Sequence, residues 1–181
     1  MPHIQFKIDP NVRAITFGYL TIVHVEAIGH CGGLLLVNSL GRPIEFHCTA
    51  PVQENRAQRI LYGKTYESFL YCEQIALALI GKAKTSVDIL FIEREQLQGF
   101  ARLANQPVLM LTPVDQPKNE IAENSEASKV GKFSLSSQSS LDASQLKLIK
   151  SHSEFLAKSI PVEEPFERIL MAIEEAQAVV R

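Results

Sequence analysis

Two short apolar runs separated by an amphipathic stretch constrain the fold of this chain more than any other feature. The runs are SVDILFIE, residues 86–93, and PVLMLTP, residues 107–113. Each has the length and composition of a strand that is covered on both faces. Between them, REQLQGFARLA places Leu97, Ala101 and Ala104 at helical spacing. This order predicts a compact βαβ unit with two parallel strands and a right-handed crossover.

The first fifty residues favour antiparallel strands. HIQFKI and YLTIVHVEAI alternate apolar and polar residues, and GLLLVNSLGRPIEFHCTA contains two strand-like runs around Asn38, Gly41 and Pro43. These three residue types supply turn chemistry, so the last stretch predicts a β-hairpin. Helical patterns occupy residues 51–62 and 66–80, and each ends at a glycine.

Composition changes sharply over residues 115–145, which contain eight serines and few large apolar side chains. Such a segment buries too little surface to offset its ordering entropy, so we expect a flexible insertion. After it, LKLIKSHSEF predicts one more strand, and PFERILMAIEEAQAVV predicts an amphipathic helix that starts at Pro165. Too little sequence remains after the insertion for a separate core. The chain is therefore expected to be a mixed α/β protein, α+β in arrangement, with residues 1–181 in one domain.

Bulk composition narrows the functional classes. Hydrophobic residues make up 46% of the 181 residues, and the formal net charge is -2. The absence of a basic excess argues against a nucleic-acid partner, and no apolar run reaches the ~18 residues of a membrane span. No signal-peptide pattern is visible, and three cysteines without a CxxC motif fit a reducing compartment. We therefore expect a cytoplasmic protein with no nucleic-acid and no membrane partner.

The stretch EFHCTAPVQENR has the His-Cys pair of a phosphate-binding loop but not the rest of it. The sixth residue after Cys48 is Glu54, where an anion-binding loop would place an arginine, and the first arginine is Arg56. A carboxylate at that position repels phosphate, and the stretch has no glycine for a tight loop. Strand alternation instead groups Ile44 and Phe46 with Cys48, and we expect this apolar set to face the core.

The same alternation places polar side chains on the opposite face of two strands. His24 and Glu26 lie two residues apart on one strand, and Glu45 and His47 do so on another. If the strands are neighbours, two imidazoles and two carboxylates converge as ligands for Zn, Mn or Fe. The alternative is a solvated sheet face with cross-strand charge pairs. A further possibility is that the hairpin brings Cys31 beside His47 to form a thiolate pair.

The strand ends of the βαβ unit offer another site. Ligands of open α/β sheets bind beyond the carboxyl ends of the strands, which here present Glu93, Thr112 and Asp115. The turn IEREQL has no glycine, which argues against a dinucleotide or P-loop site. A small-ligand or nucleotide site and an ordinary packing unit are the two interpretations.

A basic cluster lies on and after the first predicted helix. Arg56 and Arg59 fall within that helix, and Lys64 comes just after it. The cluster is a candidate surface for an acidic partner, and a solvated helix face is the alternative.

Residues 41–63, GRPIEFHCTAPVQENRAQRILYG, together with the later EPFERI, resemble conserved bacterial proteins of unassigned activity. The resemblance carries no motif with known chemistry, so it transfers no functional residue. It implies a bacterial domain.

No catalytic motif survives these tests, and a long Ser-rich segment suits partner binding. We therefore predict a soluble, non-catalytic interaction or regulatory module that binds another protein or itself and needs no cofactor. Two alternatives stay open. One is a metal-dependent, hydrolase-like enzyme built on the four His and Glu residues of the strands, and the other is a small-ligand or nucleotide sensor at the strand ends.

Overall fold

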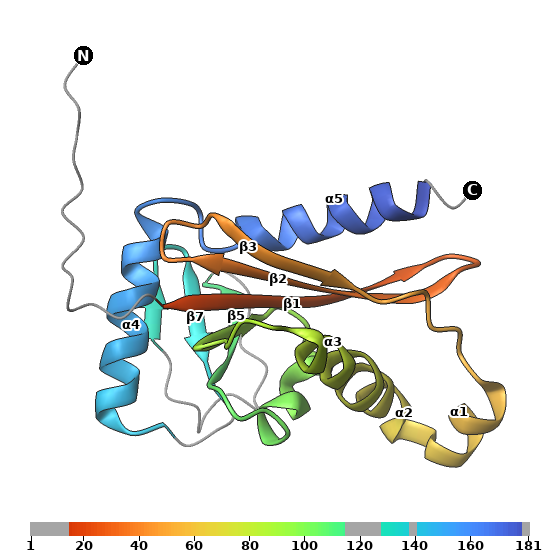
Figure 1. The fold of residues 1–181 in the computed structure, drawn as a ribbon. Coiled ribbons are helices and arrows are strands. Elements are labelled where there is room, and N and C mark those ends of the chain that lie inside the picture. The colour runs from red at the N-terminus through yellow and green to blue at the C-terminus, as the bar shows by residue number, and fades with distance from the viewer. Residues whose placement is uncertain (1–14, 115–127, 138–140, 179–181) are drawn as a thin grey trace.

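One mixed sheet organises the computed structural model, which describes residues 15–114, 128–137 and 141–178. Seven strands lie in the order β3-β2-β1-β4-β5-β7-β6. Figure 1 shows the sheet with helices on both sides. The first three, β1 (Thr16–Val25), β2 (Gly29–Asn38) and β3 (Pro43–Cys48), are antiparallel neighbours, as the alternation and turn chemistry indicate. The mixed α/β class predicted from the sequence is confirmed. The alternating HIQFKI stretch lies outside the described residues.

The predicted βαβ unit is present, with one change in its connection. β4 (Ile89–Ile92) lies parallel to β1, and β5 (Val108–Pro113) lies parallel to β4. The crossover is a 3-10 helix, η3 (Glu95–Arg102), which buries Leu97 and Phe100 completely. The spacing of the apolar residues thus indicates a helix correctly, although its turns are tighter than those of an α-helix.

Part of the segment predicted to be a flexible insertion is an ordered β-hairpin. β6 (Ser128–Val130) and β7 (Phe133–Ser136) are antiparallel, and β7 continues the sheet from β5. Val130 and Leu135 are each 1% exposed and belong to one of the two core clusters, so the hairpin is attached to the core by side chains as well as by its pairing with β5. The expectation of flexibility is corrected for these residues. Residues 115–127 and 138–140 lie outside the described part of the chain.

The stretch LKLIKSHSEF is helical, so the prediction of a final strand there is wrong. It lies within α4 (Ala143–Ala157). Asp142 caps this helix in a capping box with Gln145, and this arrangement satisfies orphan backbone donors at a helix N-terminus. Ile149 and Leu156 are buried at helical spacing. The cap and the period of the buried residues thus outweigh the short strand-like alternation.

The segment between β3 and β4 forms a helical layer on one face of the sheet. It comprises α1 (Arg56–Tyr62), the 3-10 turn η1 (Gly63–Thr65), α2 (Tyr66–Ser68), the π-helical segment η2 (Phe69–Ala76) and α3 (Leu77–Lys82). From α2 to α3 the chain is one continuous helix, and its buried side chains share a core cluster with alternate residues of β1, β2 and β4.

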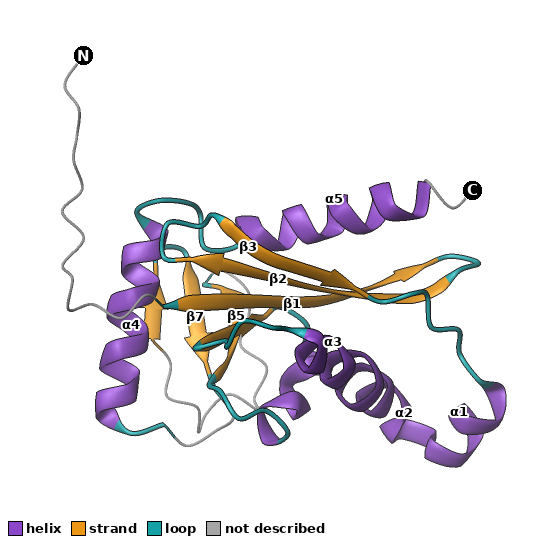
Figure 2. Ribbon diagram, viewed as in Figure 1, coloured by secondary structure: helices purple, strands orange, loops and turns teal. Residues whose placement is uncertain are grey.

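The C-terminal helix α5 (Glu164–Ala178) covers the opposite face over β1 and β2, as Figure 2 shows. Two adjacent glycines of β2 let both layers approach. A Cβ on Gly32 would lie 2.2 Å from Cγ2 of Ile75, and a Cβ on Gly33 would lie 2.2 Å from Cγ2 of Ile169. No helix in the described part of the chain is long and apolar enough to span a membrane.

The packing of α5 predicts that Ile169→Ala lowers the free energy of unfolding by about 2–5 kcal/mol, because the cavity left against Gly33 cannot close. Ile169 is fully buried, whereas Met171 on the same helix is 69% exposed. Met171→Ala is therefore the matched control and should change stability by no more than about 0.5 kcal/mol. Urea unfolding measured by circular dichroism compares the two variants. Equal losses in both would contradict the packing of Ile169 against Gly33.

Candidate functional site at the strand ends

A polar pair lies where the parallel strands β1 and β4 end together. The Thr21 hydroxyl donates a hydrogen bond of 2.7 Å to Oε1 of Glu93, the residue directly after β4. The register pairs Leu20 with Ile92, so the next residues of the two strands are neighbours. Thr21 is fully buried, and Glu93 is partly buried. The hydroxyl therefore holds a carboxylate in a fixed position at the carboxyl ends of the sheet.

A groove of about 540 Å³ lies farther along β1, between residues 23–26 and α5. In the described pairings, β1 beyond Leu20 pairs only with β2, because β4 ends at Ile92. Val23 and Val25 face the groove from the same side of β1 as Thr21, by strand alternation. The remaining lining residues are His24, Glu26, Leu170, Ile173, Glu174 and Gln177, the last four from α5.

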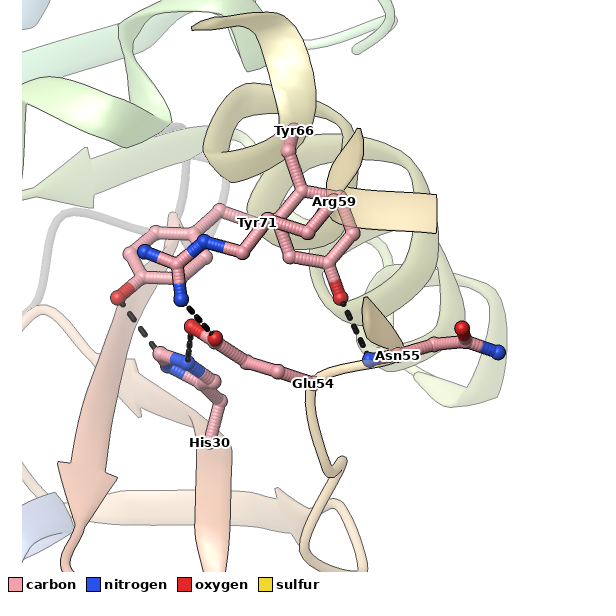
Figure 3. A network of polar contacts seen from close by, with 6 residues as sticks. All are labelled: His30, Glu54, Asn55, Arg59, Tyr66 and Tyr71. Carbon is pink, nitrogen blue, oxygen red and sulfur yellow. Dashed lines mark hydrogen bonds and ion pairs between the residues drawn. The ribbon is translucent and has the colours of Figure 1, made fainter. Parts of the chain in front are cut away.

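A second polar group lies on the other face of the sheet, around a buried histidine (Figure 3). His30 is 5% exposed, and both of its ring nitrogens have partners. Nε2 lies 3.3 Å from Oε1 of Glu54, and Nδ1 lies 3.2 Å from the Tyr71 hydroxyl. Burial raises the pKa of Tyr71, so its proton stays on the oxygen at neutral pH and is available to Nδ1. This arrangement favours the tautomer with a protonated Nε2.

The network around His30 also positions the segment that leads into α1. His30 exchanges two backbone hydrogen bonds with Val52, of 2.9 and 2.8 Å. Glu54 pairs with Arg59, and the backbone N–H of Asn55 donates to the Tyr66 hydroxyl at 3.2 Å. The segment between β3 and α1 is thus tied to β2 at one end and to α2 at the other.

The four residues expected to hold a metal are not brought together. β2 lies between β1 and β3, so His24 and Glu26 are two strands away from Glu45 and His47. His47 lies across β2 from Leu20, four residues before His24 on β1. Two strand spacings and four residues separate the imidazoles by more than roughly 10 Å. His24 instead contacts the His30 ring, with centroids 4.8 Å apart.

The residues of β3 alternate as predicted, but their two faces are exchanged. Cys48 is exposed, and Ile44 and Phe46 are 46% and 38% exposed, so the prediction that this set faces the core is wrong. β3 is an edge strand, and α5 covers β1 and β2 but not β3. Glu45 and His47 face the helical layer instead and hydrogen-bond to each other at 2.7 Å.

Cys31 does not pair with His47. Its side chain is 1% exposed and receives a hydrogen bond from the Gln177 amide, on the face covered by α5. His47 lies opposite Leu34, on the face covered by the helical layer. Burial raises the pKa of the Cys31 thiol, which disfavours the thiolate that a reactive pair would need.

The structure does not show the three residues predicted to bind a ligand at the strand ends lying together. Glu93 lies at the expected edge, held by Thr21. Thr112 lies on β5, where it pairs with Ser134 of β7, and Asp115 lies outside the described residues. Of the two predicted partner-binding arginines, Arg59 pairs with Glu54, and Arg56 starts α1 with an exposed side chain.

Sequence reasoning missed Thr21, His30 and Tyr71. Thr21 stands inside an apolar strand, where a single hydroxyl carries no signal of its own. His30 and Tyr71 are 41 residues apart, so no local spacing connects them. The one available signal is the strand-end rule, which locates Glu93 and could have led to the neighbouring residue on β1.

Two solved structures share this architecture. An endonuclease V variant from Ciona intestinalis, in complex with a 23mer DNA that contains an inosine followed by a ribo-adenosine, has a TM-score of 0.57 and 11% sequence identity, covering 93% of this chain and 88% of that chain. Endonuclease V from Bacillus subtilis also has a TM-score of 0.57 and 11% identity, covering 92% and 83%. The fold is endonuclease V-like. No protein-family model and no curated sequence matches the chain.

These likenesses overturn three predictions made from the sequence. A non-catalytic, protein-binding module is replaced as the leading interpretation, because the structural neighbours are nucleases. The exclusion of nucleic acid is wrong on the same ground, since one neighbour was solved with DNA. The prediction that the protein needs no cofactor is also overturned, because nucleases commonly use bound metal ions. The prediction depended on net charge, which averages over the whole chain and does not reveal local basic segments.

The described residues do not fit a metal centre of the usual kind. A divalent cation in a nuclease needs several oxygen ligands, most of them carboxylates or phosphates. At the ends of β1 and β4 the structure supplies one carboxylate, Glu93, and the Thr21 hydroxyl. No group of three or more His, Cys, Asp or Glu side chains that could hold a metal ion occurs in the described residues.

Glu45 predicts a specific pH dependence of stability. Backbone N–H groups of Lys84 and Thr85 donate to its carboxylate, at 2.9 and 3.0 Å, as does His47. These bonds, with the one from Lys84 largest, lower the pKa of Glu45 from 4.5 to about 2. A lowered folded-state pKa stabilises the fold above pH 4.5, and this contribution is lost as the pH falls towards 2.

Urea unfolding between pH 6 and pH 2 tests this expectation. Glu45→Gln should lose stability at pH 6 and show a weaker fall towards pH 2 than the unmodified protein does. Glu175→Gln, at an exposed position of α5, should behave like the unmodified protein. Parallel curves for Glu45→Gln and the unmodified protein would show that Glu45 does not carry this dependence.

Proposed function

We propose that this chain binds nucleic acid and hydrolyses phosphodiester bonds at the carboxyl ends of β1 and β4. One observation carries the proposal: a carboxylate, Glu93, is held by Thr21 at that edge, in a fold whose neighbours are nucleases. Carboxyl ends of parallel strands are where open α/β sheets place their reacting groups. The groove between residues 23–26 and α5 lies on the same face of β1 as Thr21, farther along the strand.

The chemistry assigned to Glu93 is that of a general base. Its carboxylate takes a proton from a water molecule, whose oxygen attacks phosphorus while the bond from phosphorus to the leaving oxygen breaks. The leaving oxygen takes up a proton from solvent, and the proton on Glu93 is released to solvent afterwards. Thr21 contributes by orienting the carboxylate, because its own hydroxyl donates to Oε1. A base placed in this way within hydrogen-bond reach of the attacking water typically accelerates a reaction about 10²–10⁴-fold.

The substrate class is inferred from the same comparison. The Ciona intestinalis endonuclease V was solved with DNA that contains inosine, so oligonucleotides with and without inosine are the first substrates to compare. A cytoplasmic location is part of the proposal. It is supported by three free cysteines, Cys31, Cys48 and Cys72, which suit a reducing compartment.

Glu93→Gln should slow cleavage strongly while leaving binding within about twofold, because the amide keeps the shape of the side chain but cannot accept a proton. The expected fall in the cleavage rate is at least about 100-fold. The measurement is product formation from labelled single- and double-stranded DNA and RNA, with and without inosine, in buffers with magnesium, manganese or a chelator. Binding is measured by fluorescence anisotropy.

Glu154→Gln is the control, since Glu154 is exposed on α4 and pairs only at 4.0 Å with Lys150 among the described contacts. It should cleave like the unmodified protein. Binding without cleavage under every condition would contradict the hydrolysis and leave the binding intact. Absence of binding to every oligonucleotide would overturn the proposal as a whole.

A further inference from the structure

Helix α1 contributes no side chain to the core. None of its residues is buried, and Ile60 and Leu61 are 71% and 83% exposed. Consecutive large apolar side chains on a surface are unfavourable in water and commonly mark a place where another molecule binds. Helix α1 therefore lies at the surface and contributes nothing to the packing of the core.

An aromatic stack lies at the end of this helix. The rings of Tyr62 and Phe69 are parallel within 19°, with centroids 4.1 Å apart. Phe69 is partly buried and supports Tyr62 from one side, whereas Tyr62 remains 40% exposed. The exposed ring surface is available to a further planar group, and nucleobases stack on such side chains irrespective of sequence.

The same segment is basic in an otherwise acidic chain. Residues 49–66 contain Arg56, Arg59 and Lys64 against one acidic residue, Glu54, which gives a formal charge of +2, whereas the whole chain carries -2. The three basic side chains are exposed. Their charge complements the phosphate backbone of a nucleic acid, which attracts Lys and Arg independently of sequence.

The segment is held in one orientation before any ligand arrives. Asn55 caps α1 by accepting hydrogen bonds from the N–H groups of Ala57 and Gln58, at 2.9 and 3.3 Å. Figure 3 shows the links that fix its base: Glu54 contacts both His30 and Arg59, and Asn55 contacts Tyr66. A preorganised surface loses less entropy on binding.

We propose that this surface, consisting of α1, Lys64 and the Tyr62–Phe69 stack, binds an unpaired stretch of nucleic-acid strand. A base stacks on Tyr62, Ile60 and Leu61 contact neighbouring bases or sugars, and Arg56 and Lys64 neutralise phosphates. An unpaired strand fits better than a duplex, because the faces of bases in a duplex are covered by the base pairs stacked above and below them. The inference rests on the proposed nucleic-acid binding and names the form of nucleic acid that is held.

Fluorescence anisotropy with labelled oligothymidylate, compared with a duplex of the same length, tests this assignment. Tyr62→Ala should weaken binding of the single strand about 5- to 150-fold, the effect of losing one base–aromatic stack. Tyr62→Phe keeps the ring and should bind like the unmodified protein. Arg56→Ala should reduce the slope of log affinity against log salt by about 0.7, as expected for one lost phosphate contact on a single strand.

Met171→Ala is the matched control, because Met171 is as exposed as Ile60 but lies on α5. It should leave affinity unchanged, and thermal melting should confirm that every variant is folded. Equal affinity of Tyr62→Ala and the unmodified protein, or tighter binding of the duplex, would overturn the inference while nucleic-acid binding stands. If the unmodified protein binds no oligonucleotide, the proposed function and this inference both fail.

Discussion

The pairing of β1 with a neighbour on each side is the interaction on which the rest of the structure depends. β1 pairs along its whole length with β2 and along only four residues with β4. Tyr19, Leu20 and Thr21 are completely buried at the point where the β4 pairing stops. Because the two partners differ in length, β1 beyond Leu20 has a strand on one side only in the described pairings, and the carboxylate of Glu93 lies where the β4 pairing ends.

Two adjacent glycines determine how closely the helices on the two faces approach the sheet. Gly32 and Gly33 point to opposite faces of β2, and each is in close contact with an isoleucine of the covering helices, Ile75 on one side and Ile169 on the other. A side chain at either position would push one layer outwards. The same close approach brings η2 near enough to β2 for Tyr71 to reach His30, so the packing of the core and the polar network share one cause.

The sequence carries the local patterns of the fold but not the interactions between distant segments. Alternation groups Cys48 with Phe46 correctly, yet which face is covered depends on where α5 lies, and no periodicity within β3 contains that information. The apolar residues of α4 allow both a strand and a helix period, and its capping residue Asp142 lies in a segment whose composition favours flexibility.

The candidate site likewise contains one residue that the sequence locates and others that it does not. The rule that ligands bind at strand ends locates Glu93, because it needs only the end of one strand. The partner of Glu93 is Thr21, 72 residues earlier, and the partners of His30 are 24 and 41 residues away. Such contacts arise from the strand order β2-β1-β4, which no short motif in the sequence specifies.

The π-helical segment η2 makes the length of the α2–α3 helix critical. A π-turn is wider than an α-turn and so rotates the helix after it relative to the helix before it. Tyr66, which contacts the segment before α1, lies ahead of η2, and Leu79, which packs against β2, lies after it. Removing one residue from η2 would turn these two ends out of phase by roughly 100°. A single-residue deletion in this helix would therefore cost the chain either the contact of Leu79 with β2 or the contact of Tyr66 with the segment before α1.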